Sequence, residues 1–234
     1  MSQSDFGLIG RGLYSPTEAS LIIRVPIRRI RRWTKGYWFV HHWKRQWSEP
    51  VIGTDLGDIG GAPVLDFADL MEVRFLSMFR DCKIGWPTIR LAAIKAKELL
   101  GTSHPFSSHR FRTDGRNILA EIVDETGDRH LLNLLSDQWE FERVVVEFLR
   151  RGLHYNGKDQ PQWWSPLGEE KSVVLDPARS FGAPIIVPGS VRTRILYGGY
   201  KAEGSYDAVA DWYRVAPDAV RDAVEFEDGL RKAA

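Results

Sequence analysis

Apolar residues recur at helical spacing on both sides of a short pattern that occurs three times. Each copy has a β-branched residue, a proline one to three positions later, and then Ile-Arg or Val-Arg. The copies are Val25–Arg31, Ile84–Arg90 and Val215–Arg221. Each follows one amphipathic stretch and opens another. Proline fits the first turn of a helix because its missing N–H has no helical partner there. The pattern therefore predicts three helix-turn-helix units.

The first unit is the most clearly delimited. Ser15-Pro16-Thr17-Glu18 is a capping box, in which Ser15 and Glu18 satisfy each other's backbone N–H groups. The second helix starts at Pro26 and ends at Gly36. At about 100° per residue its side chains divide into two faces. The apolar face holds Ile27, Ile30, Trp33 and Thr34, and the basic face holds Arg28, Arg31, Arg32 and Lys35, with Arg29 at its edge.

A basic face opposite a core face is what a DNA-recognition helix requires, because guanidinium groups bridge phosphates or bind guanine edges in the major groove. The alternative is a solvated basic surface. We favour DNA because the cations fall on the exposed side of the second helix of a helix-turn-helix. The candidate DNA-binding residues are Ser15, Thr17, Arg28, Arg29, Arg31, Arg32, Lys35, Tyr37, Lys44 and Arg45.

An aromatic and basic segment, residues 37–47, follows this helix where a wing would lie. Lys44, Arg45 and the histidine pair are expected at backbone phosphates. We interpret tryptophans 38, 43 and 47 as core or interface anchors rather than as platforms for stacked bases. His41 and His42 would point to opposite faces of a strand, which makes them a poor metal pair.

The middle of the chain predicts a second helix pair. Asp66 can cap a helix that runs to about Arg80, and Pro87 opens a helix that ends at Leu100 before Gly101. This pair carries Arg90, Lys95 and Lys97 within a net acidic segment. We expect it to pack against the first unit or against a second chain.

Further along, residues 111–124 predict a β-hairpin around Asp114-Gly115. Gly127-Asp128 would start a return strand. Residues 136–153 form a predicted amphipathic helix, and residues 161–166, with two tryptophans, a linker.

The C-terminal part predicts two short strands around residues 181–184, a helix capped by Ser205, and a last helix opened by Pro217. The last helix carries four carboxylates that we expect to be exposed: Asp222, Glu225, Glu227 and Asp228. An acidic surface would be repelled by DNA. This part therefore reads as a protein-contact or dimerisation module.

The net charge of +1 conceals a gradient along the 234 residues. Residues 1–50 carry nine Lys/Arg and three Asp/Glu, a balance of +6. Cys82 is the one cysteine, which excludes an internal disulfide and a multi-cysteine zinc site. No apolar run approaches the roughly 20 residues of a membrane helix, and the N-terminus does not resemble a signal peptide. We therefore expect a cytoplasmic protein without a cofactor or metal.

The sequence also gives little support for an enzyme. It has no phosphate-binding loop, no metal-ligand spacing and no nucleophile elbow. We therefore expect no catalytic residues.

Two segments resemble known bacterial domains. Residues 179–186 and 189–193, with matches at 206–213, Val215, Val220 and Ala223, look like a small domain family of previously unknown function. That family occurs in VapB-type antitoxins, often beside a PIN-like ribonuclease toxin. Residues 12–20, Val25-Pro26 and 29–33 are similar to the DNA-binding domain of the same antitoxins, which is itself similar to MerR-type winged helices. Arg24 replaces the usual glycine before the turn, and Val187-Pro188 interrupts the strand before Gly189.

The resemblance covers about two-thirds of the chain and implies a mainly α fold with small β-hairpins (α+β). The expected parts are residues 1–135, a MerR-like winged helix-turn-helix region with a second helix pair and hairpin; 136–170, a connecting helix and linker; and 171–234, a small helix-turn-helix domain for protein contacts. The candidate protein-contact residues are Phe181, Val191, Arg192, Arg194, Tyr213 and Val220.

The function implied is that of an antitoxin of a type II toxin–antitoxin system. Such a protein would bind its own double-stranded operator DNA as a homodimeric autorepressor and neutralise a PIN-like ribonuclease toxin. The alternative is a stand-alone MerR-like regulator that responds to a small molecule, with the middle segment and Trp163 and Trp164 lining a pocket.

Overall fold

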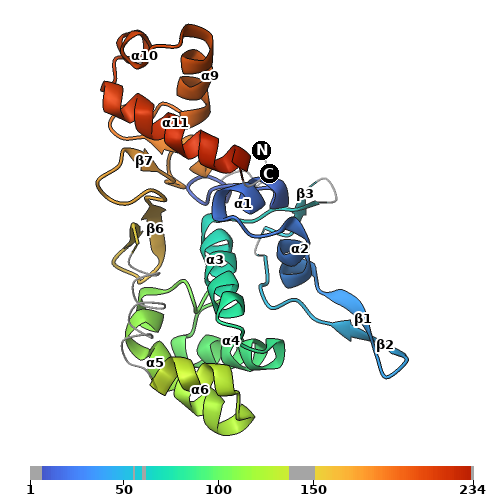
Figure 1. The fold of residues 1–234 in the computed structure, drawn as a ribbon. Coiled ribbons are helices and arrows are strands. Elements are labelled where there is room, and N and C mark those ends of the chain that lie inside the picture. The colour runs from blue at the N-terminus through green and yellow to red at the C-terminus, as the bar shows by residue number, and fades with distance from the viewer. Residues whose placement is uncertain (1–6, 55, 60–61, 137–150, 233–234) are drawn as a thin grey trace. The chain divides into compact units, whose positions relative to one another are not determined.

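The computed structural model describes residues 7–54, 56–59, 62–136 and 151–232, and the fold is mainly α with small antiparallel strand pairs, as expected (Figure 1). Two compact units can be distinguished. We call Ser15–Arg150 with Tyr155–Pro161 the N-terminal unit, and Met1–Tyr14, Arg151–His154 and Gln162–Ala234 the C-terminal unit. Within the described ranges, no helix has both the length and the apolar character that crossing a membrane requires.

Among its described residues, the N-terminal unit contains six helices and two strand pairs. Its elements are α1 (Pro16–Ile23), α2 (Ile27–Lys35), β1 (Tyr37–His41), β2 (Lys44–Ser48), β3 (Asp58–Ile59), β4 (Ala62–Pro63), α3 (Phe67–Asp81), α4 (Trp86–Leu100), α5 (His109–Thr126) and α6 (Arg129–Ser136). β1 pairs antiparallel with β2, and β3 with β4.

The C-terminal unit holds the remaining elements, with β5 and β6 reaching its boundary. They are β5 (Leu153–Tyr155), β6 (Pro161–Trp164), β7 (Val173–Val174), the 3-10 helix η2 (Ser180–Gly182), β8 (Ile185–Ile186), α9 (Thr193–Glu203), α10 (Tyr206–Tyr213) and α11 (Pro217–Lys232). β5 pairs with β6, and β7 pairs antiparallel with β8.

The threefold sequence pattern corresponds to three helix pairs: α1–α2, α3–α4 and α10–α11. A basic residue precedes the β-branched residue in every copy and adopts a left-handed backbone. Its φ is 56° at Arg24, 63° at Lys83 and 54° at Arg214. One left-handed residue ends a helix and redirects the chain, a position that glycine usually occupies. Arg24 therefore adopts a backbone conformation that glycine more often supplies at the end of a helix.

The hairpin predicted at residues 111–124 is wrong, because this segment lies within α5. Ser108 caps the helix by accepting from the Phe111 N–H at 3.2 Å. A Cβ on Gly115 would stand 2.9 Å from the Phe111 ring, so this glycine allows an aromatic ring to pack against the helix. Asp-Gly was interpreted as a turn, whereas the buried residues of the segment follow helical spacing: Phe111, Ile118, Leu119 and Ile122.

The return strand predicted at Gly127-Asp128 is also wrong. Gly127 ends α5 in a left-handed conformation. Asp128 then accepts from the N–H groups of His130 and Leu131, at 3.0 and 3.1 Å, in the first turn of α6. Asp128 thus acts as a helix cap.

The expected helix over 136–153 lies largely outside the described residues, as do Trp139, Val146 and Leu149. Residues 161–164 were expected as a linker and form β6 instead. Trp164 is buried, and its indole N–H donates to the Arg151 carbonyl at 3.1 Å. Trp163 stacks on His154.

Residues before α1 pack within the C-terminal unit. Leu13 N–H donates to the Phe181 carbonyl at 3.0 Å, and the Tyr14 hydroxyl donates to the Gly182 carbonyl at 2.8 Å. A Cβ on Gly182 would lie 2.3 Å from the Tyr14 hydroxyl, so only glycine leaves room for this contact.

The acidic face expected on α11 is only partly exposed. Asp222 and Glu227 are buried. Asp222 accepts from Lys171 Nζ at 3.0 Å and from the Ser172 N–H at 2.8 Å, and Glu227 accepts from the Thr193 hydroxyl at 2.5 Å. Asp222 and Glu227 therefore hold α11 to the rest of its unit, because donors inside the fold replace the water that these buried carboxylates would otherwise bind. Glu225 remains exposed.

Candidate nucleic-acid interface

Helix α2 has the two faces that its sequence predicts. Ile30, Trp33 and Thr34 are buried, and Ile27 is half-buried. The Thr34 hydroxyl donates to the Ile30 carbonyl at 3.0 Å, which satisfies the polar group on the buried side. The cations all lie exposed on the opposite side: Arg28, Arg29, Arg31, Arg32 and Lys35.

Some of these cations have partners within the N-terminal unit. Lys35 Nζ lies 2.7 Å from an Asp58 carboxylate oxygen, and Arg29 lies 4.0 Å from Asp81. Exposed ion pairs of this kind contribute only about 0–1 kcal/mol each. A phosphate can therefore compete for these cations. Arg28, Arg31 and Arg32 extend the basic surface beyond the two pairs.

The predicted wing is the β1–β2 hairpin, residues 37–48. Tyr37 pairs with Ser48 and His41 with Lys44, and the turn at His42 and Trp43 has positive φ values of 48° and 64°. Two successive positive φ values give the twist that a tight hairpin needs. His41 ends a strand and His42 lies in the turn. The chain between 37 and 48 contains no Asp or Glu.

The tryptophans of the hairpin do not belong to a core. Trp38 is 55% exposed, Trp47 41% and Trp43 99%. Trp38 and Trp47 pack on each other across the strands, with ring centroids 5.3 Å apart, and the Arg45 guanidinium lies 4.6 Å from the Trp38 ring. The interpretation as core anchors is wrong, because a two-stranded ribbon has no layer to cover it. Their interpretation as interface anchors stays a prediction.

The remaining candidate DNA-binding residues lie on α1 and the hairpin. Ser15 caps α1 through the predicted reciprocal bonds with Glu18, and Thr17 is exposed in the first turn. The Arg32 guanidinium lies over the Tyr37 ring, with its central carbon 4.7 Å from the ring centre. This contact joins the basic face of α2 to the hairpin. Lys44 and Arg45 are exposed.

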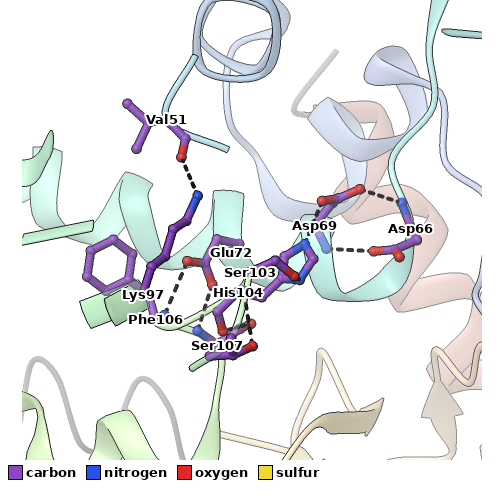
Figure 2. Close-up of polar contacts among 10 residues, drawn as sticks. Val51, Asp66, Asp69, Glu72, Lys97, Ser103, His104, Phe106 and Ser107 are labelled. Carbon is purple, nitrogen blue, oxygen red and sulfur yellow. Dashed lines mark hydrogen bonds and ion pairs between the residues drawn. The ribbon is translucent and has the colours of Figure 1, made fainter. Parts of the chain in front are cut away.

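Asp66 caps α3 as the sequence predicts, but the buried polar cluster to which it belongs was not predicted (Figure 2). Asp66 and Asp69 form a reciprocal capping box at the start of α3, with bonds of 2.8 and 3.0 Å. Asp69 also binds His104 Nε2 at 2.7 Å. Glu72, one turn further on, accepts from the backbone N–H groups of Phe106 and Ser107 at 3.2 and 2.8 Å. The cluster fastens the loop between α4 and α5 onto α3.

Burial and charge oppose each other in this cluster. Burial acts to lower the pKa of His104, but its hydrogen bond to Asp69 and the charges of Glu72 and Asp69 outweigh burial and raise that pKa to about 9. Burial raises the pKa of Asp69, which the His104 contact partly offsets, and burial also raises the pKa of Glu72. His104 is thus a protonated partner of a buried carboxylate at neutral pH.

Three side chains of this cluster lie close enough to hold a cation. They are Asp66, Asp69 and His104, each of which has one oxygen or nitrogen within 4.8 Å of those of the other two. These groups already bind one another or backbone N–H groups of α3. The arrangement is therefore accounted for by capping and ion pairing within the fold. The Asp66-x-x-Asp69 spacing was the available signal for it, whereas the contact with His104 spans 35 residues.

The candidate protein-contact residues differ in accessibility. Phe181 is 57% exposed and Arg192 and Arg194 are exposed, whereas Val191 is half-buried. Tyr213 is 37% exposed and packs beside Gly199 of α9. Val220 is fully buried in its own unit and has no surface to offer a partner.

No family model matches the chain. It is 27% identical over 228 residues to "Putative antitoxin VapB45" of Mycobacterium tuberculosis (strain ATCC 25618 / H37Rv), an alignment that covers 91% of this chain and 92% of the relative. The fold is similar to the X-ray crystal structure of Rv2018 from Mycobacterium tuberculosis, with a TM-score of 0.72, 25% identity, and coverage of 90% of this chain and 96% of that one. The likeness thus extends over both units.

Proposed function

We propose that this chain is the antitoxin of a type II toxin–antitoxin system, and that it binds its own operator DNA as an autorepressor. The antitoxin role is supported by the near full-length similarity to a relative with that name. The DNA-binding role rests on one observation: five exposed cations on α2, opposite the buried Ile30 and Trp33.

In this account α2 lies in the major groove and the β1–β2 hairpin contacts the adjacent backbone. Arg28, Arg31 and Arg32 bind phosphates or guanine edges, while Lys44 and Arg45 bind phosphates. A homodimer would place two α2 helices on half-sites about 34–36 Å apart, one helical turn of DNA.

The C-terminal unit would hold the toxin, a PIN-like ribonuclease. A nuclease site that binds metal and RNA is acidic, and a cation from the antitoxin could occupy it. Exposed Arg192 and Arg194, at the start of α9, have the required charge, and exposed Phe181 could supply apolar contact. Aromatic residues and arginine are frequent in the energetic centres of protein interfaces.

The alternative, a ligand-responsive regulator, requires a pocket for a small molecule, and the cavity described next is too small to be that pocket. The cavity lined by Phe79, Ile84, Leu119 and their neighbours measures about 10 Å³. Small-molecule sites enclose roughly 300–1,000 Å³. Trp164, expected to line such a pocket, is buried with its N–H bonded to the Arg151 carbonyl.

Alanine substitution on α2 tests the DNA-binding role. Arg28→Ala and Arg32→Ala should each weaken binding to the DNA upstream of the gene and lower the salt slope by about 0.9 per lost phosphate contact. Arg129→Ala, at an exposed arginine of α6, is the matched control and should bind as wild type. Wild-type affinity in both α2 variants would remove the assignment of α2 as the recognition helix.

Co-purification tests the toxin-binding role. If a nuclease gene lies beside this one, the two products expressed together should purify as a complex without ribonuclease activity. Failure of the nuclease to bind would leave the ligand-responsive regulator as the better account.

A further inference from the structure

Segment 48–52 follows the β1–β2 hairpin and returns along α2. The N–H groups of Val51 and Ile52 both donate to the Trp33 carbonyl, at 2.9 and 3.0 Å. A Cβ on Gly36, at the end of α2, would stand 2.4 Å from the Ser48 carbonyl oxygen. These contacts fix segment 48–52 against the C-terminal end of α2. Both ends of the hairpin lie at this point, because β1 begins just after α2 and β2 ends at Ser48.

Helix α4 holds the same segment with two cations. Arg90 Nη2 donates to Ser48 Oγ at 2.7 Å and also to the Glu49 carbonyl. Lys97, two turns further along α4, donates to the Val51 carbonyl at 3.4 Å (Figure 2). Both cations thus bind acceptors inside the fold.

An aromatic stack connects α2 and α4 beside these bonds. Trp33 of α2 stacks on Trp86, the first residue of α4, with ring centroids 5.7 Å apart and planes at 19°. The Arg90 guanidinium lies 5.6 Å from the Trp86 ring centre. Arg90 therefore contacts both the stack behind the basic face and the segment that leaves the hairpin.

The three copies of the sequence pattern all end in an arginine, so the contacts of Arg90 can be compared with those of Arg31 and Arg221. Arg31 is exposed on the basic face of α2, and Arg221 pairs with Asp218 at 2.5 Å on α11. Arg90 instead binds Ser48, 42 residues away. Of the three arginines, it is the one tied to the hairpin.

We propose that Arg90 is a positioning residue for DNA binding: it holds the β1–β2 hairpin in a fixed orientation to α2 and does not contact DNA itself. This inference rests on the proposed DNA-binding function. Two surfaces that engage one duplex bind more tightly when their relative orientation is set in advance, because less freedom is lost on binding. Loss of Arg90 should thus weaken binding without reducing the number of phosphate contacts.

Arg90→Met tests this in the full-length protein, because it removes the guanidinium donors and keeps an apolar stem against Trp86. We expect binding to upstream DNA to weaken by about tenfold, with an unchanged slope of log affinity against log salt. Arg90→Lys, which keeps one donor group, should recover part of the affinity. Lys95→Met is the matched control, because Lys95 is also a cation of α4 but pairs with Glu125 of α5, and it should bind as wild type.

Either of two binding results would overturn the proposal. Wild-type affinity in Arg90→Met would show that the hairpin needs no such support. A slope reduced by about 0.9 would show that Arg90 binds a phosphate directly.

Hydrogen exchange separates this inference from the proposed function, because it needs no DNA. In Arg90→Met, amides 38–47 should exchange faster than in wild type, while those of α3 keep their rates. Unchanged exchange in the hairpin, or equal acceleration in α3, would contradict local positioning. If wild type and Arg32→Ala bind upstream and scrambled DNA alike, the DNA-binding function fails, while the exchange result still decides whether Arg90 holds the hairpin in place.

Discussion

At the scale of single residues, His104 gives the N-terminal unit a pH-dependent stability. Its pKa in the fold is about 9, against an ordinary value of 6.5, although burial alone would lower it. A base whose pKa is raised on folding contributes stability that is fully present below pH 6.5 and is lost as pH rises through about 9. At about 1.4 kcal/mol per pKa unit, the contribution is on the order of 3 kcal/mol.

The free energy of unfolding, measured by denaturant titration, should therefore fall between pH 6.5 and 9. His104→Gln, whose amide nitrogen can take the place of Nε2 and donate to Asp69 but cannot carry a proton charge, should lack this part of the fall. The same slope in wild type and variant would show that other groups cause it.

The sequence predicts residues with local roles better than residues with distant partners. The Ser15–Glu18 capping box and the exposed cations of α2 follow from spacings of three and four residues. Asp69–His104 and Arg90–Ser48 join positions 35 and 42 residues apart. Nothing in the local spacing identifies such pairs, because they meet only when α3 packs against the α4–α5 loop and α4 packs beside the end of β2.

At the scale of elements, the junction between α2 and the hairpin depends on Gly36. Its φ of 71° and ψ of −179° lie in a region that essentially only glycine adopts. A Cβ would also meet the Ser48 carbonyl. Gly36→Ala should lower the free energy of unfolding by at least about 2 kcal/mol and weaken DNA binding.

Gly101 is the matched control, because its φ is also positive, at 63°, but a Cβ there meets nothing within 4 Å. Gly101→Ala should cost only about 1–2 kcal/mol and leave DNA affinity unchanged. Equal losses of stability and equal DNA binding in the two variants would mean that the close approach at Gly36 has no consequence.

The helix pairs could be predicted because caps and apolar spacing agree within each element. The hairpin predicted at 111–124 failed where a strong local turn signal, Asp114-Gly115, conflicted with helical periodicity. Burial of Phe111 against Phe75 and Phe106, with ring centroids 5.2 and 5.1 Å away, favours the helix. Tertiary packing therefore decided that residues 111–124 form a helix and not a hairpin.

At the scale of the whole molecule, the proposed tasks divide between the two units. Arg194→Glu, in the C-terminal unit, should weaken toxin binding by at least about tenfold, because it reverses a charge proposed to face an acidic site. It should leave DNA affinity at the wild-type value, whereas Arg32→Ala should do the reverse. Lys232→Glu makes the same change of charge at an exposed residue of another helix, α11. Equal loss of toxin binding in both charge reversals would indicate a general electrostatic effect.

The charge gradient and the resemblance of two segments are the basis for assigning DNA binding to the N-terminal unit and toxin binding to the C-terminal unit. They did not predict that residues 13 and 14 bond to Phe181 and Gly182, which places the start of the described chain in the C-terminal unit. A contact across 168 residues leaves no periodic signal.

DNA binding through α2 is tested most directly by the affinity of the full-length protein for the DNA upstream of its own gene. Fluorescence anisotropy would compare that DNA with a scrambled duplex at two salt concentrations. We expect tighter binding to the upstream DNA, with an affinity that falls steeply as salt rises. Equal binding to the two duplexes, or none, would contradict it and make the basic face of α2 a surface for protein or RNA.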